Sequence, residues 1–297
     1  MTLCNLCARN CNIDRTSGNF GACRASSTMR IGRADLHFWE EPPLKNSGAI
    51  FFTHCSLRCV YCQNWRISQA DQGRDISIKN LTDLCFELKD KGAENINIVT
   101  GTHYAPQIAE GLTEARKQGL DLPIVWNTSS YENVETIKFL TGLVDVWLAD
   151  FKYTDDHLAN ALSGINNYCE VATNSIQAMI EGSSYCKKLD CPGVIIRHLV
   201  MPGFIEHSKK TIEKVWQLFG ISAKLSIMSQ YTPIINDRHE HKIQKVLEKY
   251  PSLARTLKDG EYEEVLDYAD SLGIEDYFWQ DGEACKESFI PDFNLQD

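Results

Sequence analysis

Six short apolar segments, separated by stretches with helical periodicity, are the feature that most constrains how this chain folds. They cover residues 49–54, 96–101, 123–128, 144–151, 194–201 and 225–231. Between them, apolar side chains recur at helical spacing, as in Ile212, Val215 and Phe219. Strands that alternate with helices in this way form right-handed βα units. The alternation predicts a parallel sheet, either open and doubly wound or closed into a full or partial barrel.

The chain divides into three parts. The α/β core is expected at residues 48–235, preceded by a cysteine-rich and then irregular segment, residues 1–47. Residues 236–297 contain two helical patterns and a tail. Within the core, we expect Asn80 to cap a helix that ends near Gly92, and Pro106 to lie in the first turn of the next helix.

Polar motifs follow the predicted strands at their carboxyl ends. They read THCSLRC, TGTHY, NTSSY, DFKY, MPG and SQYTP. In parallel sheets of either closure, functional groups gather at the carboxyl ends of the strands. We therefore expect one functional site at this edge.

The first of these motifs lies in a loop with three cysteines, residues 53–64, which we call the three-cysteine loop. Cys55, Cys59 and Cys62 have the spacing C-x3-C-x2-C. Thiolates select zinc, copper(I) or iron–sulfur clusters, and a structural zinc site takes four protein ligands. A [4Fe–4S] cluster held by three thiolates leaves one iron open to another molecule. The count of three therefore favours an open iron–sulfur cluster.

Twelve of the 297 residues are cysteines, and the rest of the composition decides how to interpret them. The chain opens without an apolar leader and has no apolar run near the roughly 18 residues of a membrane span. We therefore expect a cytoplasmic protein, in which clustered thiols are metal ligands more often than disulfides. A net charge of −10 argues against a broad nucleic-acid-binding surface.

The three-cysteine loop resembles the signature of the radical SAM superfamily, including the aromatic Tyr61 before the last cysteine. Other stretches are similar to the pyruvate formate-lyase activating enzymes, among them CNLCARNCNIDR, VWLADFKY and VIIRHLVMPG. This resemblance implies a partial (β/α)6 TIM-like barrel. It implies a [4Fe–4S] cluster on the three cysteines, with S-adenosylmethionine (SAM) at the open iron. One electron then cleaves SAM to a 5′-deoxyadenosyl radical, which abstracts hydrogen from a substrate.

The resemblance also implies contacts with SAM. Tyr61 is expected near the adenine, and Asp150 and Lys152 near the methionyl carboxylate. Many members bind the methionine amine with a Gly-Gly-Glu-Pro motif after the second strand. This chain has Gly101 and Thr102 there and lacks the glutamate, so only backbone groups are left for the amine.

Three further residues belong to the predicted site. Asn127 stands where activating enzymes carry an aspartate beside a monovalent cation, and this departure puts that cation in doubt. Arg197 and His198 are expected to face the same mouth from the fifth strand. Structural roles are the alternatives: a surface lysine at Lys152, a hydrogen-bonded histidine at His198 and a loop-capping residue at Asn127.

Cys4, Cys7, Cys11 and Cys23 have the spacing C-x2-C-x3-C-x11-C. Four thiols suffice for a closed site, which fits either an auxiliary [4Fe–4S] cluster or structural zinc. Because the protein already implies cluster loading, we favour iron–sulfur. Cys285 has no partner at ligand spacing, so we interpret it as a buried thiol, with a catalytic thiol as the alternative.

These observations predict an enzyme that abstracts hydrogen from a protein or peptide, in its narrow form a glycyl-radical-enzyme activase. Modification of a small molecule or a ribosomal peptide is one alternative, and a metal-binding interaction protein is the non-enzymatic one. Anaerobic conditions are expected, because oxygen destroys an open cluster. An acidic flavodoxin or ferredoxin is the expected electron donor, and Arg58 and Arg66 are the expected docking residues. The alternative is that these two arginines belong to a solvated loop without a docking role.

Overall fold

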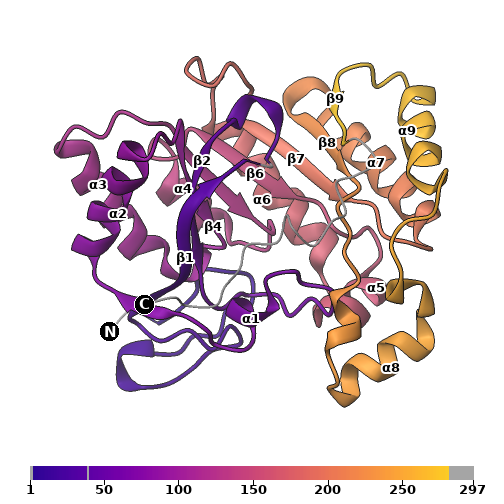
Figure 1. Cartoon of the computed structure of the whole chain (residues 1–297), viewed down its shortest axis with the longest axis horizontal. Coiled ribbons are helices and arrows are strands. Elements are labelled where there is room, and N and C mark those ends of the chain that lie inside the picture. Colours follow the sequence, from indigo (N-terminus) through magenta and orange to yellow (C-terminus); the bar gives the residue numbers. More distant parts are fainter. Residues whose placement is uncertain (1–2, 39, 281–297) are drawn as a thin grey trace.

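The computed structural model of the chain describes residues 3–38 and 40–280. At its centre is a nine-stranded sheet with the strand order β3-β1-β2-β4-β5-β6-β7-β8-β9 (Figure 1). The strands are β1 (Met29–His37), β2 (Ser47–Phe52), β3 (Arg74–Ile76), β4 (Asn95–Val99), β5 (Ile124–Thr128), β6 (Val146–Asp150), β7 (Val194–Leu199), β8 (Lys224–Met228) and β9 (Tyr277–Phe278).

The six predicted strands are β2 and β4 to β8, which are neighbours in this order and all parallel. Strands β2 and β4 to β7 are buried along almost their whole length, as a parallel sheet covered on both faces requires. In the described part of the chain, the edge strands β3 and β9 do not pair with each other. The sheet is therefore a partial barrel, which confirms the predicted fold class.

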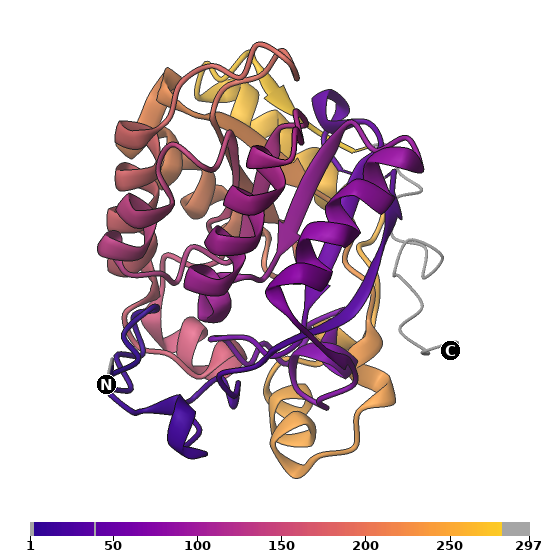
Figure 2. The same cartoon turned by 90° about the vertical axis from the view of Figure 1, so that its left-hand side faces the viewer.

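Helices follow the parallel strands as predicted. The α-helices are α1 (Trp65–Ser68), α2 (Ile78–Asp90), α3 (Ala105–Lys117), α4 (Val134–Leu140), α5 (Asp156–Ser163), α6 (Tyr168–Gly182), α7 (Ile205–Phe219), α8 (His241–Lys249) and α9 (Glu261–Ser271). Helices α2, α3, α4 and α6 lie side by side on one face of the sheet (Figure 2), and successive members of this row are in contact.

The start of α2 differs from the prediction. Ser77, and not Asn80, is the N-cap: its hydroxyl accepts a hydrogen bond from the Asn80 N–H at 3.1 Å. The Asn80 side chain accepts one in return from the Ser77 N–H at 3.0 Å. This capping box starts the helix earlier than predicted. Pro106 lies in the first turn of α3, which confirms that prediction.

β1 lies in a part of the chain that we expected to be irregular. It pairs antiparallel with β2, and the register shifts between Ile31 and Arg33. A Cβ atom at Gly32, the residue between them, would lie 2.3 Å from Ile67, so only glycine fits this irregularity. Such a shift interrupts the alternation of apolar and polar residues by which a half-buried strand is recognised.

Residues 236–280 contain the two predicted helices, α8 and α9, and also β9, which adds a parallel strand to β8. Helix α9 packs against α7 of the core. The division of the chain at residues 48 and 235 stays a prediction, and Cys285 lies outside the described residues. None of the described helices is long and apolar enough to cross a membrane.

Candidate functional site

A cavity of about 230 Å³ opens at the carboxyl ends of the parallel strands. Its lining includes most of the predicted site residues, namely Cys55, Cys59, Cys62, Tyr61, Asn127, Asp150, Lys152 and Arg197. They come from the three-cysteine loop after β2, and from β5, β6 and β7 or the residues that follow them. Parallel strands thus bring residues far apart in the sequence into one space. The four N-terminal cysteines do not line it.

The three-cysteine loop is tied to two helices. His54 follows β2 with φ at +67°, a left-handed conformation that histidine rarely adopts. Its N–H donates to the Ile67 carbonyl in α1 at 2.9 Å. Further along, the Val60 N–H donates to the Leu162 carbonyl in α5 at 2.8 Å. Helices α1 and α5 therefore hold the loop from both sides.

Each of the three thiols lies beside a hydrogen-bond donor. The Leu57 N–H donates to the sulfur of Cys55 at 3.4 Å, and the Ser163 hydroxyl donates to that of Cys59 at 3.0 Å. The Ser68 hydroxyl lies 3.4 Å from the sulfur of Cys62 and can donate to it once that sulfur is a thiolate. Hydrogen bonds to sulfur stabilise the thiolate, which is the form that binds metal. The loop therefore presents three soft donors prepared for a thiophilic group.

Burial raises the pKa of the Cys55 and Cys59 thiols and so opposes formation of the thiolates that bind metal. The ammonium of Lys152 acts in the opposite direction and favours both thiolates. Within residues 3–38 and 40–280, no three His, Cys, Asp or Glu side chains are already gathered to hold a metal ion. The three thiolates of the loop are soft donors of the kind that an iron–sulfur cluster requires.

Asp150 and Lys152 form an ion pair at the end of β6. Lys152 Nζ lies 2.6 Å from Asp150 Oδ2, and each side chain is only about one-fifth exposed. Burial alone would lower the pKa of Lys152, but Asp150 and Cys59 outweigh it and raise that pKa. The Tyr168 hydroxyl fixes this segment, because it donates to the Asp150 carbonyl and accepts from the Lys152 N–H. Lys152 is therefore a fixed positive charge beside the thiols.

Tyr61 belongs to a buried hydrogen-bonded chain that ends at a cysteine. Its hydroxyl lies 2.6 Å from that of Tyr153, which lies 2.7 Å from the Ser163 hydroxyl. Ser163 donates to the sulfur of Cys59. Sequence analysis missed Tyr153 and Ser163, although Tyr153 ends the DFKY motif. The chain holds the Tyr61 ring in the cavity wall.

Arg197 is engaged by two glutamates and is not free at the mouth of the site. Its Nε and Nη2 donate to the two carboxylate oxygens of Glu41 at 2.7 and 2.5 Å, and Nη2 also pairs with Glu40. Glu40 itself lines the cavity and accepts a hydrogen bond from Asn97 at 3.0 Å. Both glutamates lie between β1 and β2, at the amino ends of the parallel strands. Glu40 therefore forms part of the cavity wall at the amino ends of the strands.

Three predicted residues, Gly101, Thr102 and His198, do not line the cavity. The ring nitrogens of His198 lie 2.9 Å from the Phe151 carbonyl and 2.9 Å from the Ser208 hydroxyl of α7. Burial lowers the pKa of His198 to about 3. This is the geometry of the structural role that we gave as the alternative.

Thr102 donates to a buried carboxylate, Glu132, at 2.5 Å. Glu132 also accepts hydrogen bonds from Thr128 and from the Trp126 indole, and burial raises its pKa. Gly101 faces the core, where a Cβ atom would lie 2.6 Å from Ile98. Glu132 was not predicted as a site residue.

Residues 49–215, more than half of the chain, match the family model of the radical SAM superfamily. The chain belongs to the radical SAM superfamily. Membership implies a [4Fe–4S] cluster and SAM as cofactors. The matched region contains the three-cysteine loop and the Asp150–Lys152 pair.

The comparisons also give two similar proteins. An uncharacterized protein of Methanocaldococcus jannaschii, MJ0674, is 29% identical over 282 residues, which cover 92% of this chain and 75% of the relative. Streptococcus suis SuiB, solved with the precursor peptide SuiA, is similar with a TM-score of 0.50 and 14% identity. That match covers 77% of this chain but only 46% of SuiB. At this identity, the likeness concerns the fold alone.

Proposed function

We propose that this radical SAM protein abstracts a hydrogen atom from a protein or peptide, using a cluster held by Cys55, Cys59 and Cys62. When bound there, the cluster supplies the electron that cleaves SAM to the 5′-deoxyadenosyl radical. The shared cavity carries the proposal, because the thiols open into the same space as the Asp150–Lys152 pair. Soft donors beside a fixed cation suit a cluster together with a cofactor that bears a carboxylate.

Different residues of the cavity are proposed to contact different parts of SAM. Lys152 offers its ammonium to the methionyl carboxylate, and Asp150 holds that ammonium in place. Tyr61, fixed through Tyr153, offers its ring to the adenine. Asn127 lines the cavity too, but its amide donates to Glu40 at 3.5 Å. We therefore assign it to holding Glu40 in the cavity wall and not to SAM.

A polypeptide is the substrate class that we propose. The reacting C–H group has to reach the 5′ carbon of the deoxyadenosyl group in this cavity, and a polypeptide can present one residue there while the rest of its chain stays outside. SuiB, which is similar in fold, was solved with a precursor peptide, and this supports a peptide here. In the narrower form, the residue is a glycine of a partner enzyme, and the protein is its activase.

Substrate-dependent formation of 5′-deoxyadenosine tests this proposal. Cells are grown in deuterated medium, and their extract is divided into a macromolecular and a small-molecule fraction. Reduced, reconstituted protein is then incubated anaerobically with SAM and with one fraction or the other. We expect stimulation by the macromolecular fraction, deuterium in the 5′-deoxyadenosine, and loss of both after protease treatment. Stimulation by the small-molecule fraction alone would overturn the proposed substrate class.

The electron donor belongs to the same proposal. Arg58 lies in the three-cysteine loop and is partly exposed, and Arg66 is exposed on α1, which directly follows the loop. The chain as a whole carries a net charge of −10. A local positive surface beside the cluster suits an acidic flavodoxin or ferredoxin.

A further inference from the structure

Four cysteines lie outside the cavity, in residues 3–25, which we call the four-cysteine segment. Its first part is a closed loop, because the Cys4 N–H donates to the Ile13 carbonyl at 2.8 Å and the Asn12 N–H donates to the Cys4 carbonyl at 2.9 Å. Cys7 and Cys11 lie inside this loop. A second turn, from Gly21 to Arg24, presents the fourth cysteine.

Two of the four sulfurs in this segment lie beside backbone N–H groups, as metal-bound thiolates often do. The Ala22 N–H points at the sulfur of Cys11 at 3.3 Å, and the Ala25 N–H points at that of Cys23 at 3.5 Å. A Cβ atom at Gly21 would lie 2.9 Å from the sulfur of Cys11, so a glycine leaves that sulfur its space.

The four thiols differ in burial. Cys7 and Cys23 are buried, whereas Cys4 and Cys11 are partly exposed. A group of four thiols of which two are buried beside polar backbone is more than hydrophobic packing requires.

We propose that Cys4, Cys7, Cys11 and Cys23 bind a metal centre through four thiolates, and that this centre holds the three-cysteine loop in place. Zinc and a second [4Fe–4S] cluster share the required chemistry. A segment this short has no core of its own, so metal binding supplies the free energy that keeps it folded. This goes beyond the proposed function, and its first test does not depend on that function.

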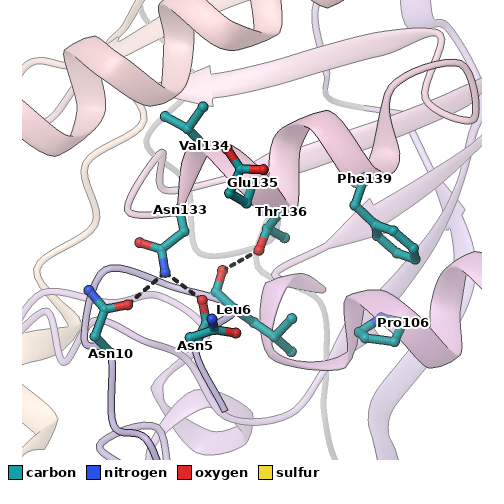
Figure 3. Close-up of a pocket in the computed structure, with 9 residues that line it drawn as sticks. All are labelled: Asn5, Leu6, Asn10, Pro106, Asn133, Val134, Glu135, Thr136 and Phe139. Atoms are coloured by element: carbon teal, nitrogen blue, oxygen red, sulfur yellow. Dashed lines mark hydrogen bonds between the residues drawn. The ribbon is translucent and has the colours of Figure 1, made fainter. Parts of the chain in front are cut away.

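The barrel provides a preformed seat for the segment. At the start of α4, the Asn133 side chain donates to the Asn5 carbonyl and to the side chain of Asn10 (Figure 3). It also donates to the Cys7 carbonyl at 3.2 Å. One turn later, the Thr136 hydroxyl donates to the carbonyl of Leu6 at 2.9 Å. Residues of the segment and of α4 together line a cavity of about 530 Å³ (Figure 3).

Arg9 links the four-cysteine segment to the three-cysteine loop. It lies between Cys7 and Cys11, and its Nε donates to the Ser56 carbonyl at 3.0 Å. Its Nη1 donates to the Gly164 carbonyl at 2.9 Å. Ser56 follows the first cysteine of the three-cysteine loop, and Gly164 follows the serine that donates to its second cysteine. A metal bound by the four-cysteine segment would therefore hold Arg9 in place, and Arg9 in turn would hold the three-cysteine loop through these two hydrogen bonds.

Metal analysis of the full chain tests the metal centre. In protein reconstituted anaerobically, we expect either about one zinc beside about four irons, or about eight irons, per chain. Cys4→Ser together with Cys11→Ser should remove the zinc, or about half of the iron, and leave the rest. Cys169→Ser on α6 is the matched control and should change neither. Wild-type protein with about four irons and no zinc, or with the four thiols joined as disulfides, would overturn the proposal.

The bracing role is tested by Arg9→Met, and this part rests on the proposed function. The cluster on the three-cysteine loop is recognised by an EPR signal that shifts on addition of SAM. In the presence of a chelator, we expect this signal to decay about threefold faster or more in Arg9→Met than in the wild type, because two hydrogen bonds to the loop and its neighbour are lost. The N-terminal metal content should stay at the wild-type value. Arg116→Met is the control, since Arg116 also makes two hydrogen bonds, to the Leu120 carbonyl and to Asp145, and neither partner belongs to the three-cysteine loop or the four-cysteine segment. An unchanged decay rate in Arg9→Met would refute the brace, whereas absence of any SAM-sensitive signal would count against the proposed function instead.

Discussion

At the level of single residues, we expect Lys152 to carry the charge on which SAM binding depends most. Its ammonium is held by Asp150 in a partly enclosed site, where charge interactions are stronger than in water. We expect Lys152→Met to weaken SAM binding about tenfold or more, which corresponds to ~1.4 kcal/mol. Titration of SAM into the reduced protein, followed by EPR, measures this affinity.

Lys79→Met is the matched control for that experiment. Lys79 forms an exposed ion pair with Asp83 on α2, away from the cavity. Its replacement should leave the affinity for SAM unchanged. Equal affinities in Lys152→Met and Lys79→Met would show that Lys152 does not meet the carboxylate of SAM.

Glu132 gives a prediction on pH dependence. Burial raises its pKa above the reference value of 4.5, so the folded protein binds this proton more tightly than the unfolded chain. The resulting stabilisation is complete below pH 4.5 and is lost as the pH rises through the raised pKa. In that window, wild-type protein should lose up to ~1.4 kcal/mol per pH unit relative to Glu132→Gln. Urea unfolding at several pH values measures the difference, and a difference that does not change with pH would contradict the prediction.

At the scale of elements, the loop with the 3-10 turn η2 (Pro42–Leu44) closes the amino end of the barrel through Arg197. Removal of this guanidinium leaves Glu40 and Glu41 buried without a countercharge. Arg197→Met should therefore lower the free energy of unfolding by about 3 kcal/mol, and added Glu41→Gln should recover part of it. Chemical denaturation tests this; a loss below about 1 kcal/mol, the range of exposed pairs such as Lys79–Asp83, would contradict it.

The six strands β2 and β4 to β8 could be predicted because burial makes each of them rich in apolar residues. Strands β1, β3 and β9 could not be predicted in this way. Only Ile76 of β3 is buried, β9 has two residues, and the register of β1 shifts beside Gly32. These strands form because they hydrogen-bond to neighbouring strands of the sheet. Their own sequences show little of the apolar pattern by which a strand is recognised.

The candidate site could be predicted where a motif directly follows a strand, as at Cys55 and Asp150. The left-handed backbone at Thr100, with φ at +61°, turns the chain so that the next two residues leave the cavity, and no periodicity reveals this turn. Partners from distant segments were also missed. Ser163 lies 104 positions from its cysteine, and Glu40 lies 157 positions from its arginine.

At the scale of the whole molecule, the positive surface near the three-cysteine loop contrasts with the net charge of −10. We expect Arg58→Gln to slow reduction by an acidic flavodoxin about threefold or more at low salt, because charge complementarity acts mainly on the association rate. Stopped-flow measurement of cluster reduction tests this. Reduction by dithionite, which needs no docking, should be unchanged, and equal slowing with both reductants would contradict a docking role.

We propose that the three cysteines and the cavity beside them form a site for SAM cleavage. The decisive measurement is the amount of 5′-deoxyadenosine that reduced, anaerobically reconstituted protein forms from SAM. We predict formation by the wild type and by Cys169→Ser, and none by Cys59→Ala. Equal formation by Cys59→Ala, or none by wild-type protein that contains its cluster, would show that the three-cysteine loop is not a site of SAM cleavage.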